Sequence, residues 1–158
     1  MDKAHVFQAN DVLLQNCNPG KNVVVAGGGS VGVETAEYLT LYGSNVAIVE
    51  MREDILIGCE REVSLMLRNS IKENGIKVYT DAKVCEIGDD TVKLERKGKE
   101  IILEEVDSVI IAAGSKPYNT LQEPIEALGI KTRVIGDCHE VRNGLKDIYE
   151  GFMAGYEV

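Results

Sequence analysis

Apolar runs alternate with helix-like segments along the first half of this sequence. Val23–Val25 is a short, continuous apolar run of the kind that predicts a buried strand. From Val31 to Tyr42 small and apolar residues recur at helical spacing, which predicts a helix with one face on a sheet, and Gly43 is its expected end. A second apolar run, Val46–Val49, predicts another buried strand, so this segment is expected to form a parallel β-α-β unit.

The pattern continues with a second helix and a third strand. Helical spacing predicts an amphipathic helix that ends near Asn74-Gly75, and Ile76–Thr80 follows as a strand of the same sheet. The positions that define the helix face are Val63, Met66, Leu67, Ser70 and Ile71.

Three short strand-like runs, separated by glycine-containing turns, come next. Their alternation of apolar and polar positions is typical of half-exposed antiparallel strands, so they predict a β-meander. Ser108–Ala113 is again a continuous apolar strand, and Gly114 ends it. The predicted fold is therefore α/β, a parallel sheet with flanking helices in which an antiparallel three-stranded meander replaces the third crossover helix. The three runs are Ala82–Ile87, Thr91–Arg96 and Glu100–Glu105.

The turn after the first predicted strand carries the most specific chemical signal. Gly27, Gly29 and Gly32 form the pattern G-x-G-x-x-G between a strand and a helix. In a dinucleotide site the first glycine permits the tight turn, the second lets the backbone approach a pyrophosphate, and the third lets the helix pack closely. The helix begins near Ser30, and its unpaired N–H groups, carrying about half a positive charge, would face the phosphates. The sequence thus predicts a Rossmann-like sheet that binds a dinucleotide.

Glu50 lies at the end of the second predicted strand, eighteen positions after Gly32. A carboxylate there can accept hydrogen bonds from both ribose hydroxyls of NAD, or of the adenosine of FAD, and it repels a 2′-phosphate. Arg52 is the one feature that favours NADP; it could instead stack on the adenine or be a solvated surface charge. With the acid at the strand end, the sequence favours NAD(H) over NADP(H).

Charge and composition narrow the class of protein. The 158 residues suit one domain, and the formal net charge of −9 argues against nucleic acid or an anionic membrane as the main partner. An anionic dinucleotide must therefore be held by local features. No apolar run approaches the roughly 20 residues of a membrane span. The first ten residues lack the apolar core of a signal peptide, so we expect a cytoplasmic protein.

Cysteine and histidine offer no second chemical site. No two cysteines form a C-x-x-C pair, so we expect mostly reduced structural thiols, although Cys59 precedes a helix that could activate it. His5 and His139 are too few and too far apart for a metal site or a catalytic triad. We expect no metal and no catalytic side chain. The four cysteines are Cys17, Cys59, Cys85 and Cys138.

Several separated motifs resemble one family of flavoproteins. The NAD-binding domain and following segment of the pyridine-nucleotide oxidoreductases, enzymes with two dinucleotides, are similar to VVVAGGGSVGVETAEYL, VAIVE, VDSVIIAAGSKPYN and VIGDC. The nearest resemblance is to NADH:flavin oxidoreductases of the NADH oxidase, 2-enoate reductase and dienoyl-CoA reductase type. It covers nearly the whole chain, including the ending VRNGLKDIYEGFMAGYEV, which is similar to their last helix.

The resemblance implies a set of cofactor-binding positions. Glu50 matches the acid that binds ribose. Glu34 matches an acid near the nicotinamide, although an acid near a helix N-terminus has an equally good electrostatic role. Asp137, with Gly136, matches a motif that contacts the pyrophosphate and ribityl chain of the flavin. This sequence has Ala-Ala-Gly where the family often has Ala-Thr-Gly. The remaining positions are the loop residues Gly27, Gly28, Gly29, Ser30, Val31 and Gly32, the adenosine neighbours Met51 and Arg52, and the turn Ala112, Ala113 and Gly114.

The resemblance also divides the chain. Residues 1–20 correspond to an interdomain connection, residues 21–115 to the NAD(H)-binding domain, and residues 116–158 to a segment that belongs in the family to the FAD domain. The family's earlier FAD motif is absent from these residues, as are the FMN barrel and iron–sulfur cysteines of the enoate-reductase branch. We therefore expect a domain separated from a larger enzyme, the parent, whose FAD lies in other parts. Whether Met1 is native stays open, and an exposed half-domain surface favours a homo-oligomer.

Three functions stay open. The domain could bind NADH and position it for hydride transfer to the flavin domain of the parent, a role that needs no acid–base side chain here. It could bind FAD in the same glycine loop, which the order of the motifs disfavours. It could be a non-catalytic redox sensor that binds NAD(H), although no DNA-binding or dimerisation element is seen in the sequence. The substrate of the parent enzyme cannot be read from these residues.

Overall fold

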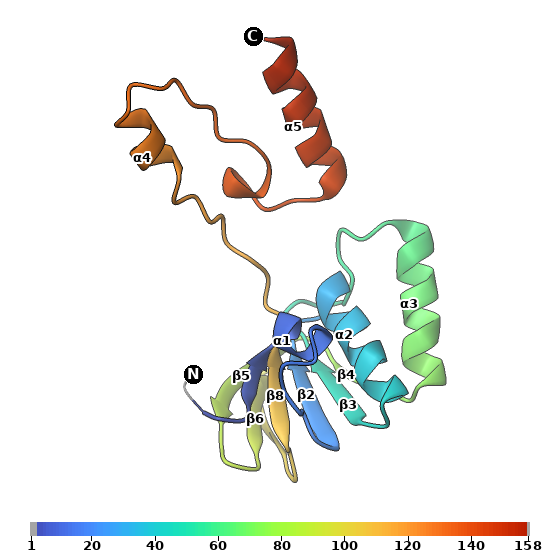
Figure 1. The fold of residues 1–158 in the computed structure, drawn as a ribbon. Helices are drawn as coiled ribbons and strands as arrows, with labels where there is room; N and C mark the ends of the chain where they lie inside the picture. Colours follow the sequence, from blue (N-terminus) through green and yellow to red (C-terminus); the bar gives the residue numbers. More distant parts are fainter. Residues whose placement is uncertain (1–2, 158) are drawn as a thin grey trace. The chain divides into compact units, whose positions relative to one another are not determined.

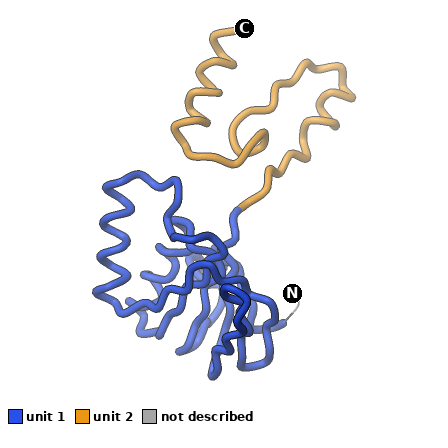
Figure 2. The backbone as a smooth tube through the Cα atoms, turned by 180° about the vertical axis from the view of Figure 1, so that it is seen from behind, with its two compact units in different colours: residues 1–114 blue, residues 115–158 orange. Residues whose placement is uncertain are grey.

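A computed structural model describes residues 3–157, so the question of Met1 lies outside the described residues. The chain forms two compact units, residues 1–114 and residues 115–158 (Figure 2). Each unit is described by itself. No helix within residues 3–157 has the length and apolar composition needed to cross a membrane.

A five-stranded parallel sheet is the centre of the first unit (Figure 1). β2 lies in the middle of the sheet, between β8 and β3, and all four strand pairs are parallel. The predicted parallel sheet is therefore confirmed. In spatial order the strands are β1 (Val6–Gln8), β8 (Ser108–Ile111), β2 (Asn22–Ala26), β3 (Asn45–Val49) and β4 (Lys77–Tyr79).

Helices cover one face of this sheet. α2 (Ser30–Leu41) and α3 (Arg61–Glu73) follow β2 and β3, and the predicted helix ends are right to within two residues. Gly43 has a left-handed backbone, with φ of +87°, which explains why α2 ends there. The core under the helices joins β2, β3 and β8 to the helix faces through residues such as Val25, Val33, Ile48, Leu67 and Ile110.

The predicted meander covers the other face. β5 (Ala82–Ile87), β6 (Val92–Arg96) and β7 (Lys99–Leu103) form a separate antiparallel sheet in sequence order. Val92 and Leu94 of β6 are fully buried and share a second apolar cluster with Val24 of β2 and Val109 of β8. The parallel strands are apolar on both faces because both faces are covered.

Residues 6–13 contain two elements that the sequence pattern did not predict. β1 pairs in parallel with β8, and α1 (Ala9–Leu13) follows at once. The strand has three residues and the helix five, so neither is long enough to show a period. Ala9 and Val12 nevertheless reach the main core. The assignment of residues 1–20 to an interdomain connection stays a prediction.

The second unit has no buried residue within the part of the chain that the structure describes. It contains α4 (Gln122–Glu126), a 3-10 turn at Gly136–Cys138 and α5 (Gly144–Tyr156). One face of α5 is apolar and exposed, with Ile148 and Phe152 at 73% and 66% exposure. Polar contacts rather than a core therefore hold this unit together.

Ile110 tests the packing of the first unit. Its side chain is fully buried in β8, so Ile110→Ala should lower the free energy of unfolding by about 3 kcal/mol, through lost burial and a residual cavity. Ile102→Ala is the matched control, because Ile102 of β7 is 51% exposed, and it should cost less than about 1 kcal/mol. Urea denaturation of the two variants measures the difference, and equal losses would contradict the described core.

Candidate functional site

Two of the three motif glycines are required by the fold itself. Gly27 follows β2 with φ of +123°, and a Cβ there would lie 2.3 Å from the carbonyl oxygen of Ala112. Gly32 lies in α2, where a Cβ would lie 2.0 Å from the carbonyl oxygen of Gly27. Real Cβ atoms do not approach this closely. Any other residue would push the loop from Ala112 at the first position, or the helix from the loop at the second.

Gly29 is different, because nothing in the described chain requires a glycine there. Its φ is −71° and its ψ is −179°, an extended conformation open to any residue, and a Cβ would have no atom within 4 Å. Among the described residues, the backbone N–H groups of Gly29, Ser30 and Val31 have no hydrogen-bond partner. These free donors lie at the positive end of the helix dipole. The loop therefore presents unpaired backbone donors of the kind that bind anions at helix N-termini.

Glu50 lies beside this loop, at the end of the neighbouring strand β3. The residue is buried, at 7% exposure. Its Oε2 accepts the N–H of Gly28 at 2.7 Å, and its Oε1 accepts the N–H of Arg52 at 2.9 Å. Burial acts to raise the pKa of the carboxyl, but the two backbone N–H donors and the charge of Arg52 outweigh it, so the pKa is lowered. The carboxylate stays ionised and keeps acceptor capacity on both oxygens.

Arg52 and Met51 follow Glu50 at the surface. The guanidinium of Arg52 is about half exposed, and its Nε lies 3.3 Å from Oε1 of Glu50. Met51 is 69% exposed. The structure therefore gives Arg52 a partner in the chain, and its stacking on adenine or reading of a phosphate stays a prediction.

The turn after β8 lies next to the glycine-rich loop. β8 pairs with β2, and the N–H of Ala112 donates to the carbonyl of Ala26 at 2.8 Å. Gly114 has φ of +91°, where a side chain would be strained.

Glu34, on α2, is exposed and has no ion-pair partner among the described residues. Thus Ala112 contacts the turn directly, whereas Glu34 lies on the surface of its helix.

Apart from Met51 and Arg52, sequence reasoning missed the connection between β3 and α3, residues 51–60. The N–H of Leu56 donates to the carbonyl of Gly28 at 2.7 Å, so this connection lies against the glycine-rich loop. Ile55 and Leu56 are buried, at 4% and 3% exposure. No period marks such an irregular segment, and the pair Ile55-Leu56 was its single sequence signal.

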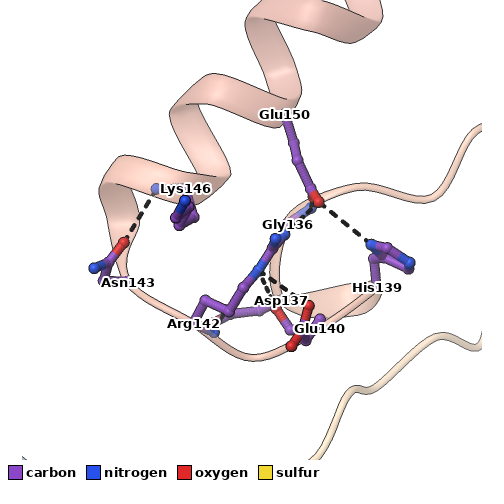
Figure 3. A network of polar contacts seen from close by, with 8 residues as sticks. All are labelled: Gly136, Asp137, His139, Glu140, Arg142, Asn143, Lys146 and Glu150. Atoms are coloured by element: carbon purple, nitrogen blue, oxygen red, sulfur yellow. Dashed lines mark hydrogen bonds and ion pairs between the residues drawn. The ribbon is translucent and has the colours of Figure 1, made fainter. Parts of the chain in front are cut away.

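Asp137 lies in the second unit and is not placed relative to the residues above. It is exposed, and its Oδ1 accepts the N–H of Arg142 at 3.3 Å (Figure 3). Glu150 of α5 holds the adjacent turn, because its Oε2 accepts the N–H of Gly136 at 2.7 Å and its Oε1 pairs with Arg142. The Arg142 contact, with help from the Gly136 N–H, lowers the pKa of Glu150 to about 2. No local sequence pattern indicates the Arg142–Glu150 pair, because its members are eight positions apart and outside one element.

Within residues 3–157, no group of three or more His, Cys, Asp and Glu residues could hold a metal ion. The described cysteines are all free, and burial raises the pKa of Cys17. Within the described residues, the glycine-rich loop and Glu50 are therefore the candidate functional site.

The arrangement defines a Rossmann-like FAD/NAD(P)-binding domain. Residues 2–149 match the family described as pyridine nucleotide-disulphide oxidoreductase, and the chain belongs to this family. It is 34% identical, over 95% of its length, to a bilirubin reductase of Mediterraneibacter gnavus, and 35% identical, over 99%, to an NADH oxidase of Thermoanaerobacter brockii. The solved complex of 2-naphthoyl-CoA reductase with 2-naphthoyl-CoA aligns over 99% of the chain with a TM-score of 0.87 and 28% identity.

These relatives are oxidoreductases, and the chain spans about a quarter of their length. It covers 23% of the bilirubin reductase, 25% of the NADH oxidase and 24% of the naphthoyl-CoA reductase chain. The resemblance seen in the sequence motifs is confirmed.

Two glycine variants show which glycine of the loop the fold requires. Gly32→Ala should lower the free energy of unfolding by about 2 kcal/mol or more, because its Cβ would clash with the Gly27 carbonyl. Gly29→Ala should stay within about 0.5 kcal/mol of the original, because its Cβ meets nothing. Denaturant titration measures both, and a large loss in Gly29→Ala would mean that the fold itself needs this glycine.

The lowered pKa of Glu50 predicts a pH-dependent contribution to stability. The ionised carboxylate stabilises the fold above its unfolded-state pKa, and this contribution is lost as the pH falls through the lowered folded-state value. Glu50→Gln should therefore cost more at neutral pH than at about pH 3. Urea unfolding at both pH values measures this, with the exposed Glu53→Gln as control. A cost for Glu50→Gln that does not change with pH would contradict the described hydrogen bonds.

Proposed function

We propose that this chain is the NADH-binding domain of a larger flavin-dependent oxidoreductase. It binds NADH through the glycine-rich loop and orients it for hydride transfer to a flavin held by other parts of the parent enzyme. The bound nicotinamide supplies the hydride, and the residues of this chain contribute binding and orientation. No side chain here acts as an acid or base in this proposal.

The observation that carries the proposal is the open space beside Gly29, where a Cβ would have no atom within 4 Å. Gly29 is the N-cap of α2, but neither its backbone conformation nor crowding requires a glycine there, so its small size leaves room for something that approaches from outside. The three free N–H groups next to it match the acceptor oxygens of a pyrophosphate. The N–H of Gly28 does not take part, because Glu50 already accepts it.

Glu50 supports NADH over NADPH. Its carboxylate is ionised and faces the loop, so it can accept ribose hydroxyls and repels a 2′-phosphate. Arg52 keeps Glu50 charged through its backbone N–H and through its guanidinium, whose Nε lies 3.3 Å from Oε1 of Glu50. The name of the Thermoanaerobacter brockii relative, NADH oxidase, agrees with this choice.

The remaining predicted positions take supporting roles in the proposal. Met51 and Arg52 flank the adenosine, and the turn Ala112, Ala113 and Gly114 borders the cofactor. Glu34 lies toward the nicotinamide end. Asp137, with the second unit, belongs to the flavin domain of the parent and contacts flavin once that domain is present.

Nucleotide titration of the whole chain tests the proposal. We expect NADH to bind more tightly than NADPH or FAD, and Glu50→Arg to weaken NADH binding about tenfold while NADPH becomes the preferred ligand. Glu53→Arg changes the charge equally at an exposed neighbouring position and should leave the preference unaltered. Isothermal calorimetry gives all the affinities. Equal binding of NADH and NADPH by the original chain would contradict the role of Glu50, and tightest binding of FAD would favour an FAD-binding module.

A further inference from the structure

The connection of residues 51–60 fixes the residue that precedes Gly29. The carbonyl of Gly28 accepts the N–H of Leu56 at 2.7 Å, and its N–H donates to Glu50 at 2.7 Å. A Cβ on Gly28 would lie 2.6 Å from Cγ2 of Ile55, so the connection also packs on the backbone at this point. The position of the free N–H groups therefore depends on where residues 51–60 lie.

Arg68, on α3, is the side chain that holds this connection. Its Nη1 and Nη2 donate to the two carboxylate oxygens of Asp54, at 3.1 and 2.8 Å. Nη2 also donates to the carbonyl of Ile55 at 2.7 Å, and Nε to Oγ of Ser64 at 3.3 Å. A planar guanidinium can make all these contacts at once, whereas an ammonium group cannot. The hydrogen bonds from Arg68 lower the pKa of Asp54 despite its exposure.

The backbone of Leu56 shows why a restraint is needed. Its φ is +58°, in the left-handed region that a branched side chain rarely adopts. A strained residue persists only where its surroundings determine it. The burial of Leu56 and the Arg68 contacts with the two residues before it provide that determination.

We propose that Arg68 is a positioning residue for dinucleotide binding. It holds residues 54–56 against Gly28, which sets the orientation of the N–H groups that receive the pyrophosphate. Arg68 does not touch the ligand, and its effect passes through Asp54, Ile55 and Leu56. This inference rests on the proposed function and adds a residue outside the glycine motif to the binding machinery.

The test compares Arg68→Gln with Lys72→Gln in the whole chain. Lys72 is on the same helix and is exposed, and its substitution removes the same charge without removing a side-chain hydrogen bond or ion pair among the described residues. We expect Arg68→Gln to weaken NADH and ADP-ribose by the same factor, about tenfold, because both ligands carry the pyrophosphate. Lys72→Gln should leave both affinities unchanged. Arg68→Lys should recover part of the affinity, since it keeps the charge but not the planar fork.

A double-mutant cycle with Asp54→Asn shows whether the two residues act together. In the Arg68→Gln background the Asp54 change should add less than about threefold, because the contact is already lost. Hydrogen exchange without ligand supplies a second measurement. The Leu56 amide should exchange faster in Arg68→Gln than in Lys72→Gln, while amides of β2 and β8 keep their protection, which a general loss of stability would not produce.

The outcomes separate this inference from the proposed function. If the original chain binds NADH and Arg68→Gln binds it equally well, the inference is overturned and the proposed function is unaffected. A loss of NADH affinity without loss of ADP-ribose affinity also overturns it, because the effect would not pass through the pyrophosphate loop. If the original chain binds neither ligand, the proposed function fails and the inference fails with it.

Discussion

The site depends on the hydrogen bond between the N–H of Gly28 and the carboxylate of Glu50. This contact joins the end of β3 to the turn after β2, and it is made by a buried, ionised side chain in a region of low dielectric. It removes one N–H from the set that could meet a ligand and leaves those of Gly29, Ser30 and Val31. The same carboxylate is thus both a structural acceptor and the residue that faces the proposed ribose, so the geometry of the loop and the choice of nucleotide are coupled.

The two units of the chain are stabilised in different ways. The first buries apolar residues on both faces of a parallel sheet, as a sheet between helices and a meander requires. The second has no buried residue in the described part and relies on contacts such as those of Glu150 with Gly136 and Arg142 (Figure 3). The exposed apolar face on α5 agrees with the proposal that a further domain of a larger enzyme packs on this unit. The quarter-length coverage of the relatives agrees with this interpretation.

The sequence was informative where structure is periodic or sterically forced. The strands around Val24 and Ile48, the helix after Ser30 and the three-stranded meander follow from period and turn residues, and the structure confirms them. Gly27 was predicted to permit a tight turn and Gly32 to allow close helix packing, and in the structure both positions are too crowded for a Cβ atom. By contrast, β1 and α1 were too short to show a period. The Arg68–Asp54 and Arg142–Glu150 pairs join residues that only the folded chain brings together, and no local pattern encodes them.

The negative net charge of the chain explains why the loop would need N–H groups that are held in place. With a formal net charge of −9, the long-range field repels a dinucleotide, and Glu50 adds a negative charge beside the loop. In the proposed function, attraction then comes from the positive end of the α2 dipole and from N–H donors whose direction is fixed before the ligand arrives, since both act at short range. If the loop could move freely, the entropy cost of ordering it on binding would cancel much of the favourable binding free energy. The hydrogen bonds of Gly28 to Glu50 and to Leu56 hold it from both sides, and this is how the acidic domain would present the proposed anion-binding surface.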